Sequence, residues 1–139
     1  MKYDCQIITD SASMERQNRI IREGIISFNE PFLGGSQEQF TVCVNDKNSL
    51  IGGAVVYAHT QSIYINILWV DSNYRGLSIG STLLEAVENE AVKRNITSST
   101  LDTFSFQAEK FYLKSGYKRL GIIEDYIEGH DRIFLRKAL

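Results

Sequence analysis

The chain has few of the residues that mark several common classes of protein. Its 139 residues include one proline and two cysteines, and its formal net charge is −2. Neither Cys5 nor Cys43 has the spacing of a metal or redox site, so we expect buried, reduced thiols, as in a cytoplasmic protein. The small charge and the absence of a basic block argue against binding to nucleic acid.

Long apolar runs, internal repeats and low-complexity linkers are also missing. No apolar stretch approaches the about 20 residues that cross a bilayer, so we expect no membrane association. Asp4 and the polar residues that follow it do not resemble a secretory signal. No repeat or low-complexity linker divides the sequence. The length suits one domain, and residues 1–139 are therefore predicted to form a single domain.

Two common phosphate-binding motifs are absent from a segment that is otherwise typical of a phosphate loop. Residues 70–84 read as the end of a buried strand, a glycine-bearing turn and the start of an amphipathic helix. Gly80 is followed by Ser81 and not by the lysine of a P-loop, and no G-x-G-x-x-G pattern is present. A helix N-terminus offers unpaired N–H groups to phosphate oxygens, and Arg75 adds a positive charge. The segment therefore predicts a ligand that carries a pyrophosphate.

Hydrophobic periodicity and turn residues predict the order of the elements. We expect a strand over 3–9, a helix from a cap near Asp10 to about Ile26, and a loop over 28–35. Six further strands and two further helices follow, with strands over 40–44, 50–59, 63–70, 97–103, 117–124 and 132–137, and helices over 79–94 and 107–114. In strand 63–70, alternation places Ile63, Ile65, Ile67 and Trp69 on one face, with Trp69 in the core.

This order, together with the glycine-bearing turn, resembles one family over nearly the whole chain. Residues 75–80, Arg-Gly-Leu-Ser-Ile-Gly, are similar to motif A of the GCN5-related N-acetyltransferases, Arg/Gln-x-x-Gly-x-Gly/Ala, with Ser78 where glycine is usual. Residues 101–117 resemble motif B, and residues 125–135 resemble the ending of a bacterial branch of small acetyltransferases. The resemblance implies an α/β class, the acyl-CoA N-acyltransferase fold, with a mixed, mainly antiparallel sheet flanked by helices.

The resemblance also implies acetyl-CoA as co-substrate and no metal. The pyrophosphate would lie on the loop that starts at Arg75, and the pantetheine arm would enter a gap that a bulge opens between strands 63–70 and 97–103. The Leu68 N–H would donate to the thioester oxygen. Ser105 would contact the arm or would cap the helix near 107. The coenzyme contacts that the resemblance implies are Leu68, Trp69, Val70, Arg75, Gly76, Leu77, Ser78, Ile79, Gly80, Ser81, Ser105 and Ala108.

Tyr112 is the catalytic candidate. It lies in Phe-Tyr-Leu-Lys-Ser-Gly-Tyr at 111–117, which matches the family signature F-Y-x-x-x-G-F/Y, whose tyrosine often protonates the departing thiolate. The alternative is a core aromatic residue at helical spacing whose hydroxyl is bonded to the backbone.

No general base is evident. Tyr64 and Asn66 stand where many relatives carry a glutamate, so a water chain through Asn66 is one substitute. Glu30, Asp125 and His130 are further candidates, with plain surface charge as the alternative. Residues predicted to bind the acceptor are Phe28, Glu30, Tyr64, Asn66 and Asp125.

The resulting prediction is an enzyme that moves an acetyl group to the primary amine of a small molecule. Two alternatives stay open: an acetyltransferase that modifies a protein N-terminus or lysine, and a non-catalytic acyl-CoA-binding domain. The C-terminal resemblance is to a branch that includes enzymes acting on aminoglycoside-like antibiotics. The fold often dimerises, and strand 132–137 is a candidate to pair with a second subunit in a homodimer.

Overall fold

The computed structural model describes residues 2–34 and 38–139 and divides the chain into two compact units, Met1–Ser36 and Gln37–Leu139. The first unit contains the helix α1 (Ser11–Leu33). Asp10 caps it as predicted, because its carboxylate accepts the Ser13 N–H at 2.9 Å. The helix ends at Gly34, which adopts a left-handed φ of 69° and donates its N–H to the Glu30 carbonyl.

Two predictions for the first unit are wrong. Residues 2–9 contain no strand, because β-rich composition forms a strand only where a neighbouring strand supplies hydrogen bonds. The loop expected over 28–35 is helical as far as Leu33. Pro31 lies in the last turn, where its missing N–H removes one hydrogen bond and does not stop the helix. Residue 35 lies outside the described residues.

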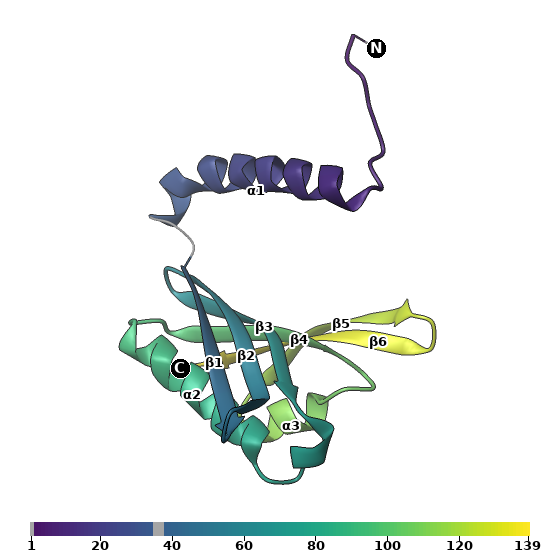
Figure 1. Ribbon diagram of the computed structural model, residues 1–139. Helices are drawn as coiled ribbons and strands as arrows, with labels where there is room; N and C mark the ends of the chain where they lie inside the picture. The colour runs from purple at the N-terminus through teal and green to yellow at the C-terminus, as the bar shows by residue number, and fades with distance from the viewer. Residues whose placement is uncertain (1, 35–37) are drawn as a thin grey trace. The chain divides into compact units, whose positions relative to one another are not determined.

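The second unit is built on a six-stranded sheet (Figure 1). Its strands are β1 (Glu38–Asp46), β2 (Ser49–His59), β3 (Ser62–Val70), β4 (Ser98–Phe104), β5 (Lys118–Ile127) and β6 (His130–Ala138). The spatial order is β1-β2-β3-β4-β6-β5, and only the β3–β4 pair is parallel. The structure therefore confirms the mixed, mainly antiparallel sheet.

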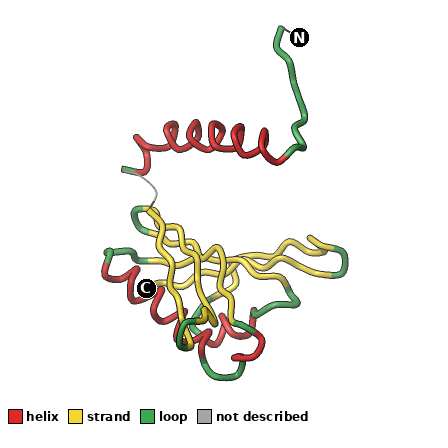
Figure 2. Tube along the Cα trace, in the orientation of Figure 1, coloured by secondary structure: helices red, strands yellow, loops and turns green. Residues whose placement is uncertain are grey.

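Two helices and a short turn connect these strands (Figure 2). The 3-10 helix η1 (Ser72–Tyr74) and α2 (Ile79–Lys93) follow β3, and α3 (Glu109–Lys114) follows β4. The apolar stripe of α2 and one ring of α3 bury against the sheet in a single core, which includes Val56, Ile63, Leu84, Val87, Leu101, Tyr112, Ile133 and Leu135. In the described parts of the chain, no helix combines the length and the apolarity that a bilayer span requires.

A bulge in β3 changes which side chains face this core. Val56 pairs with Ile65 and Val55 pairs with Ile67, so Asn66 is an extra residue in β3. Beyond it the alternation reverses: Leu68 packs against the core, whereas Ile67 is 51% exposed and Trp69 is 44% exposed. The prediction that Ile67 and Trp69 share the core face with Ile63 is therefore wrong, because one inserted residue moves every later side chain to the other face.

The position of β6 also differs from the expectation for a dimer. β6 lies between β4 and β5, so both of its edges already form hydrogen bonds within the chain. It cannot pair with a second subunit as predicted for 132–137, and in this sheet the edge strands are β1 and β5. A homodimer itself stays a prediction.

The cysteines are reduced but not buried. Cys5 and Cys43 are both unpaired and both exposed, which corrects the expectation of buried thiols. Cys43 alternates along β1 with the half-buried Val42 and Val44, so its side chain lies on the opposite face of the strand. Cys5 lies in the strand-free segment before α1.

Candidate active site

The neighbouring strands β3 and β4 separate halfway along their length. Their parallel ladder pairs Ser62 with Ser98 and continues only to Ile65 with Leu101, although β3 runs on to Val70 and β4 to Phe104. The ladder stops one residue before the bulge at Asn66. The predicted bulge and gap are thus both present, and the backbone of β3 beyond Ile65 is free of β4.

A cavity of about 250 Å³ occupies this gap, and we call it the gap cavity. Its lining consists of residues 65–68 of β3, residues 102–104 of β4, and Gln107, Ala108 and Tyr112. Leu68, Asn66, Ala108 and Tyr112 are residues that the sequence singled out, so the structure brings these four together.

Tyr112 is a buried residue whose side chain lines the gap cavity. It is 7% exposed, and burial raises its pKa to about 12. Within the described residues its hydroxyl has no hydrogen-bond partner, whereas the nearby Tyr117 hydroxyl lies 2.8 Å from Ser99 Oγ. Tyr112 is thus part of the core but not bonded to the backbone, and its O–H remains available to a group in the cavity.

A second cavity lies at the N-terminus of α2, and we call it the loop cavity. It has a volume of about 270 Å³ and is lined by residues 74–76 and 78–81 together with Val70 and Phe111. Most of the predicted pyrophosphate loop therefore lines one cavity. The first N–H groups of α2 have no partner within the helix, and Arg75 lies beside them, so the chemistry of this cavity suits an anion.

The backbone of the loop needs two residues in the left-handed region. Gly76 has a φ of 78° and Ser78, the cap residue before α2, has a φ of 62°. Glycine adopts this conformation without a steric penalty, which explains why the family motif has glycine at position 78. Serine has adopted it here without a side-chain capping bond.

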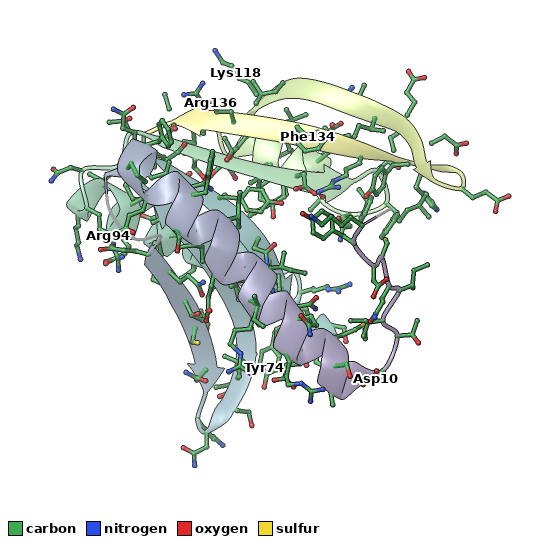
Figure 3. The ribbon with its side chains drawn as sticks, turned by 90° about the horizontal axis from the view of Figure 1, so that it is seen from above. Asp10, Tyr74, Arg94, Lys118, Phe134 and Arg136 are labelled. Carbon is green, nitrogen blue, oxygen red and sulfur yellow. The ribbon has the colours of Figure 1, made fainter. Side chains whose placement is uncertain are left out.

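Two contacts hold the loop against the sheet. The hydroxyl of Tyr74, which is labelled in Figure 3, donates to the Asp46 carboxylate at 2.7 Å and so connects η1 to the end of β1. Gly52 allows α2 to approach β2 closely, since a Cβ there would lie 3.1 Å from the Trp69 carbonyl oxygen and 3.2 Å from Ile79. The start of α2 is therefore placed by packing as well as by its own sequence.

Several predicted coenzyme residues line neither cavity. Leu77 is exposed, and Trp69 lies on the outward face after the bulge. The Ser105 hydroxyl accepts the Asp131 N–H at 3.0 Å. It does not cap α3, whose cap residue is Ala108, so the capping alternative for Ser105 is wrong. Contacts of these three residues with a coenzyme stay predictions.

The predicted acceptor residues fall into two groups. Tyr64 donates a hydrogen bond to Asp102 beside the gap cavity, and Asn66 lines the cavity. Asp125 lies farther along β5 with a φ of 50°, and its carboxylate accepts the Gly129 N–H at 2.7 Å in the hairpin turn. Phe28 and Glu30 belong to α1 in the other unit, and their part in acceptor binding stays a prediction.

Sequence reasoning missed eight residues that line the cavities: Ile65, Ile67, Tyr74, Asp102, Thr103, Phe104, Gln107 and Phe111. Asp102 carried the clearest signal, because it is a carboxylate in the middle of a strand that is otherwise apolar or hydroxylated. Gln107 forms a hydrogen bond with the last residue of β4, since its side-chain oxygen accepts the Phe104 N–H at 2.7 Å. Across residues 2–34 and 38–139, no group of three or more metal-binding side chains is close enough to hold an ion.

Comparison with known proteins gives a family match. The model of the acetyltransferase (GNAT) family matches residues 7–117, which is most of the chain and includes both cavities.

Individual relatives and solved structures that resemble the chain are also named as acetyltransferases. The chain is 33% identical over 100 residues to blasticidin-S acetyltransferase from Streptomyces morookaense, covering 71% of this chain and 74% of the relative. It is 28% identical over 133 residues to an acetyltransferase from Agrobacterium fabrum, covering 94% and 96%. The crystal structure of an acetyltransferase from Bacillus cereus superposes with a TM-score of 0.78 at 29% identity and 99% coverage of both chains.

Proposed function

Because the chain belongs to the GNAT family and is an N-acetyltransferase that uses acetyl-CoA, we propose that its acceptor is the primary amine of a small molecule. The gap cavity carries this proposal. A hydroxyl donor without a partner, Tyr112, lines the space where β3 and β4 separate.

The two cavities fit the two ends of the coenzyme. Val70 lines the loop cavity and Leu68 lines the gap cavity, two residues earlier on the same strand. A ligand with its pyrophosphate at the first turn of α2 could lay its peptide-like arm along β3, whose backbone has no strand partner on the β4 side beyond Ile65. The N–H groups of Ile79, Gly80 and Ser81 would hold the phosphate oxygens.

The side chains and backbone of the gap cavity would then act on the transfer. Acetyl-CoA supplies the thioester whose carbonyl carbon the amine attacks. The Leu68 N–H would donate to the carbonyl oxygen as negative charge develops there. Tyr112, with its pKa raised to about 12 by burial, would be protonated at neutral pH and would donate to the departing sulfur.

A small acceptor is favoured by size and by similarity. The gap cavity has a volume of about 250 Å³, which leaves little space for a peptide segment. The relative from Streptomyces morookaense is by its name an acetyltransferase of blasticidin S, a small molecule. These observations support the small amine over the alternative of a protein N-terminus or lysine.

The first experiment is isothermal titration of the purified chain with acetyl-CoA. We expect saturable one-to-one binding that free CoA competes away. The absence of binding would overturn the coenzyme assignment of both cavities.

The second experiment is a screen of primary amines, with release of free CoA thiol as the readout. Small aliphatic and aromatic amines form one arm, and short peptides with a free N-terminus or a lysine form the other. Turnover with small amines alone is expected. Turnover with peptides alone would replace the proposal by the protein acetyltransferase, and coenzyme binding without any turnover would favour the non-catalytic domain. The cytoplasmic location, the single domain and the homodimer stay predictions.

A further inference from the structure

The gap cavity contains a single charged side chain. Among the described residues that line it, Asp102 on β4 is the only one with a formal charge. Its side chain is 13% exposed and shares the cavity with Tyr112. The mechanism described under the proposed function gives Asp102 no role. A largely buried carboxylate must be paired to be stable, and one that lines a reaction site is a candidate for a role in the reaction.

Two hydrogen bonds orient this carboxylate from the neighbouring strands. Arg132 on β6 donates its Nε–H to Oδ1 of Asp102 at 2.9 Å, and the Tyr64 hydroxyl on β3 donates to Oδ2. Each carboxylate oxygen can accept two hydrogen bonds, so one position on each oxygen is left for a donor that enters the cavity.

Arg132 is itself held in place by aromatic rings. Its guanidinium carbon lies 5.0 Å from the centre of the Tyr126 ring and 5.2 Å from that of Phe134, which follows two residues later on β6. Its Nη1 also donates to the Tyr126 hydroxyl at 3.2 Å. The Tyr126 ring stacks in turn on Phe104, which lines the gap cavity. Residues of β4, β5 and β6 therefore fix the ion pair that orients Asp102.

The surroundings keep the carboxylate charged. Burial raises the pKa of Asp102, but the hydrogen bonds from Arg132 and Tyr64 and the positive charge of Arg132 lower it by more. The net pKa lies below its ordinary value, so Asp102 is anionic at neutral pH. It is accordingly a poor proton acceptor and a good partner for a cation.

We propose that Asp102 binds the amino group of the acceptor in the gap cavity, accepting hydrogen bonds from an aliphatic primary ammonium and stabilising positive charge on the nitrogen during attack. This inference rests on the proposed function and names the residue that selects an amine for that site. Before attack the bound ammonium releases one proton to solvent water, which leaves the neutral amine that attacks the carbonyl carbon. As the C–N bond forms, the nitrogen becomes positive. As the C–S bond breaks, the proton leaves the nitrogen and ends on the sulfur through the Tyr112 hydroxyl. Asp102 lowers the energy of the charged nitrogen and keeps no proton.

The test measures amine binding without turnover. The protein is saturated with CoA, which cannot donate an acetyl group, and is titrated with butylammonium while the methyl NMR signals of isoleucine and leucine are followed. Ile65, Ile67 and Leu68 line the cavity and report on it. Butanol, a neutral molecule of nearly the same shape, is the matched ligand. We expect saturable shifts with butylammonium and none with butanol.

Asp102→Asn should weaken butylammonium binding by roughly tenfold or more, the loss expected for an ionic hydrogen bond in a half-buried site, while acetyl-CoA binding is unchanged. The control is Glu128→Gln, which removes the same charge from the hairpin outside the cavity and should bind butylammonium as the wild type does. Because Asp102→Asn leaves Arg132 without its anion, the double variant Asp102→Asn/Arg132→Gln is tested as well. It replaces the ion pair by two neutral amides and should also lose the binding.

Each outcome decides a separate point. Equal binding of butylammonium by the wild type and both Asp102 variants would overturn the inference, as would an absence of butylammonium binding to the CoA-saturated wild type. Neither result would affect the proposed function, which fails only if acetyl-CoA does not bind or no amine is acetylated.

Discussion

Phe111 and Tyr112 are consecutive residues of α3, yet they line different cavities. Phe111 lines the loop cavity and Tyr112 lines the gap cavity, and their ring centres are 5.0 Å apart. One turn of a six-residue helix thus borders the expected site of the pyrophosphate and the expected site of the chemistry. A substitution on either side of this turn should affect one property and spare the other.

Tyr112→Phe should lower kcat by about a hundredfold, the usual effect of losing one positioned proton donor, with acetyl-CoA affinity unchanged. Since the Tyr112 hydroxyl has no hydrogen-bond partner in the described chain, its loss should leave the thermal unfolding temperature nearly unchanged. Steady-state turnover, titration calorimetry and thermal unfolding check the three points.

Tyr117→Phe is the matched control for this substitution. It removes a buried hydroxyl that lies 2.8 Å from Ser99 Oγ, so it should reduce the free energy of unfolding by about 1 kcal/mol without changing turnover. An unchanged kcat in Tyr112→Phe would show that Tyr112 is not the acid.

The pH dependence of kcat/KM should follow the acceptor and not the protein. No described side chain of the gap cavity has a pKa near neutrality, because the pKa of Asp102 is lowered and that of Tyr112 is raised to about 12. The attacking amine must be neutral, so kcat/KM should rise with pH up to the pKa of the acceptor and then level off while Tyr112 is still protonated. Ethylamine and the less basic trifluoroethylamine should give different midpoints. A shared midpoint for both amines would reveal a general base in the protein.

Gly80→Asp should weaken acetyl-CoA binding on the order of a hundredfold, because it places a carboxylate beside the expected pyrophosphate. The fold should tolerate the change, since a Cβ at Gly80 would make only an ordinary contact with the Phe111 ring at 3.5 Å. Gly80→Asn adds nearly the same volume without the charge and should retain most of the affinity. Normal binding by the aspartate variant in calorimetry would mean that the loop cavity does not hold the phosphates.

Gly76→Ala should reduce the free energy of unfolding by roughly 1 kcal/mol, the penalty of a left-handed conformation for a residue with a Cβ. The cause would be conformational alone, because Gly76 has a φ of 78° and nothing lies within 4 Å of the added Cβ. Gly121→Ala, which also meets nothing within 4 Å but has no left-handed φ, should show no such loss in urea unfolding. Equal losses in both variants would contradict this explanation.

Local features of the chain could be predicted from the sequence alone. The helical stripe of α2, the cap at Asp10 and the turn at Gly76 depend on residues close together along the chain, and all three are present as expected. The resemblance to the family motif allowed the fold to be predicted from these local features. The match to the family model confirms the family. Tyr112 could be named as a candidate for the same reason, since its signature lies within seven residues.

Only the tertiary structure decided which residues meet. The extra residue at Asn66 turns Trp69 away from the core, and the place of β6 between β4 and β5 brings Arg132 to Asp102, 30 positions away in the sequence. Neither the register of a bulge nor the order of strands in a sheet is encoded by the periodicity of one segment, because both depend on hydrogen bonds between segments. The sequence by itself determined most of the helices and strands and the glycine-bearing turn before α2, and the pairing of the strands decided that an aspartate lines the same cavity as Tyr112.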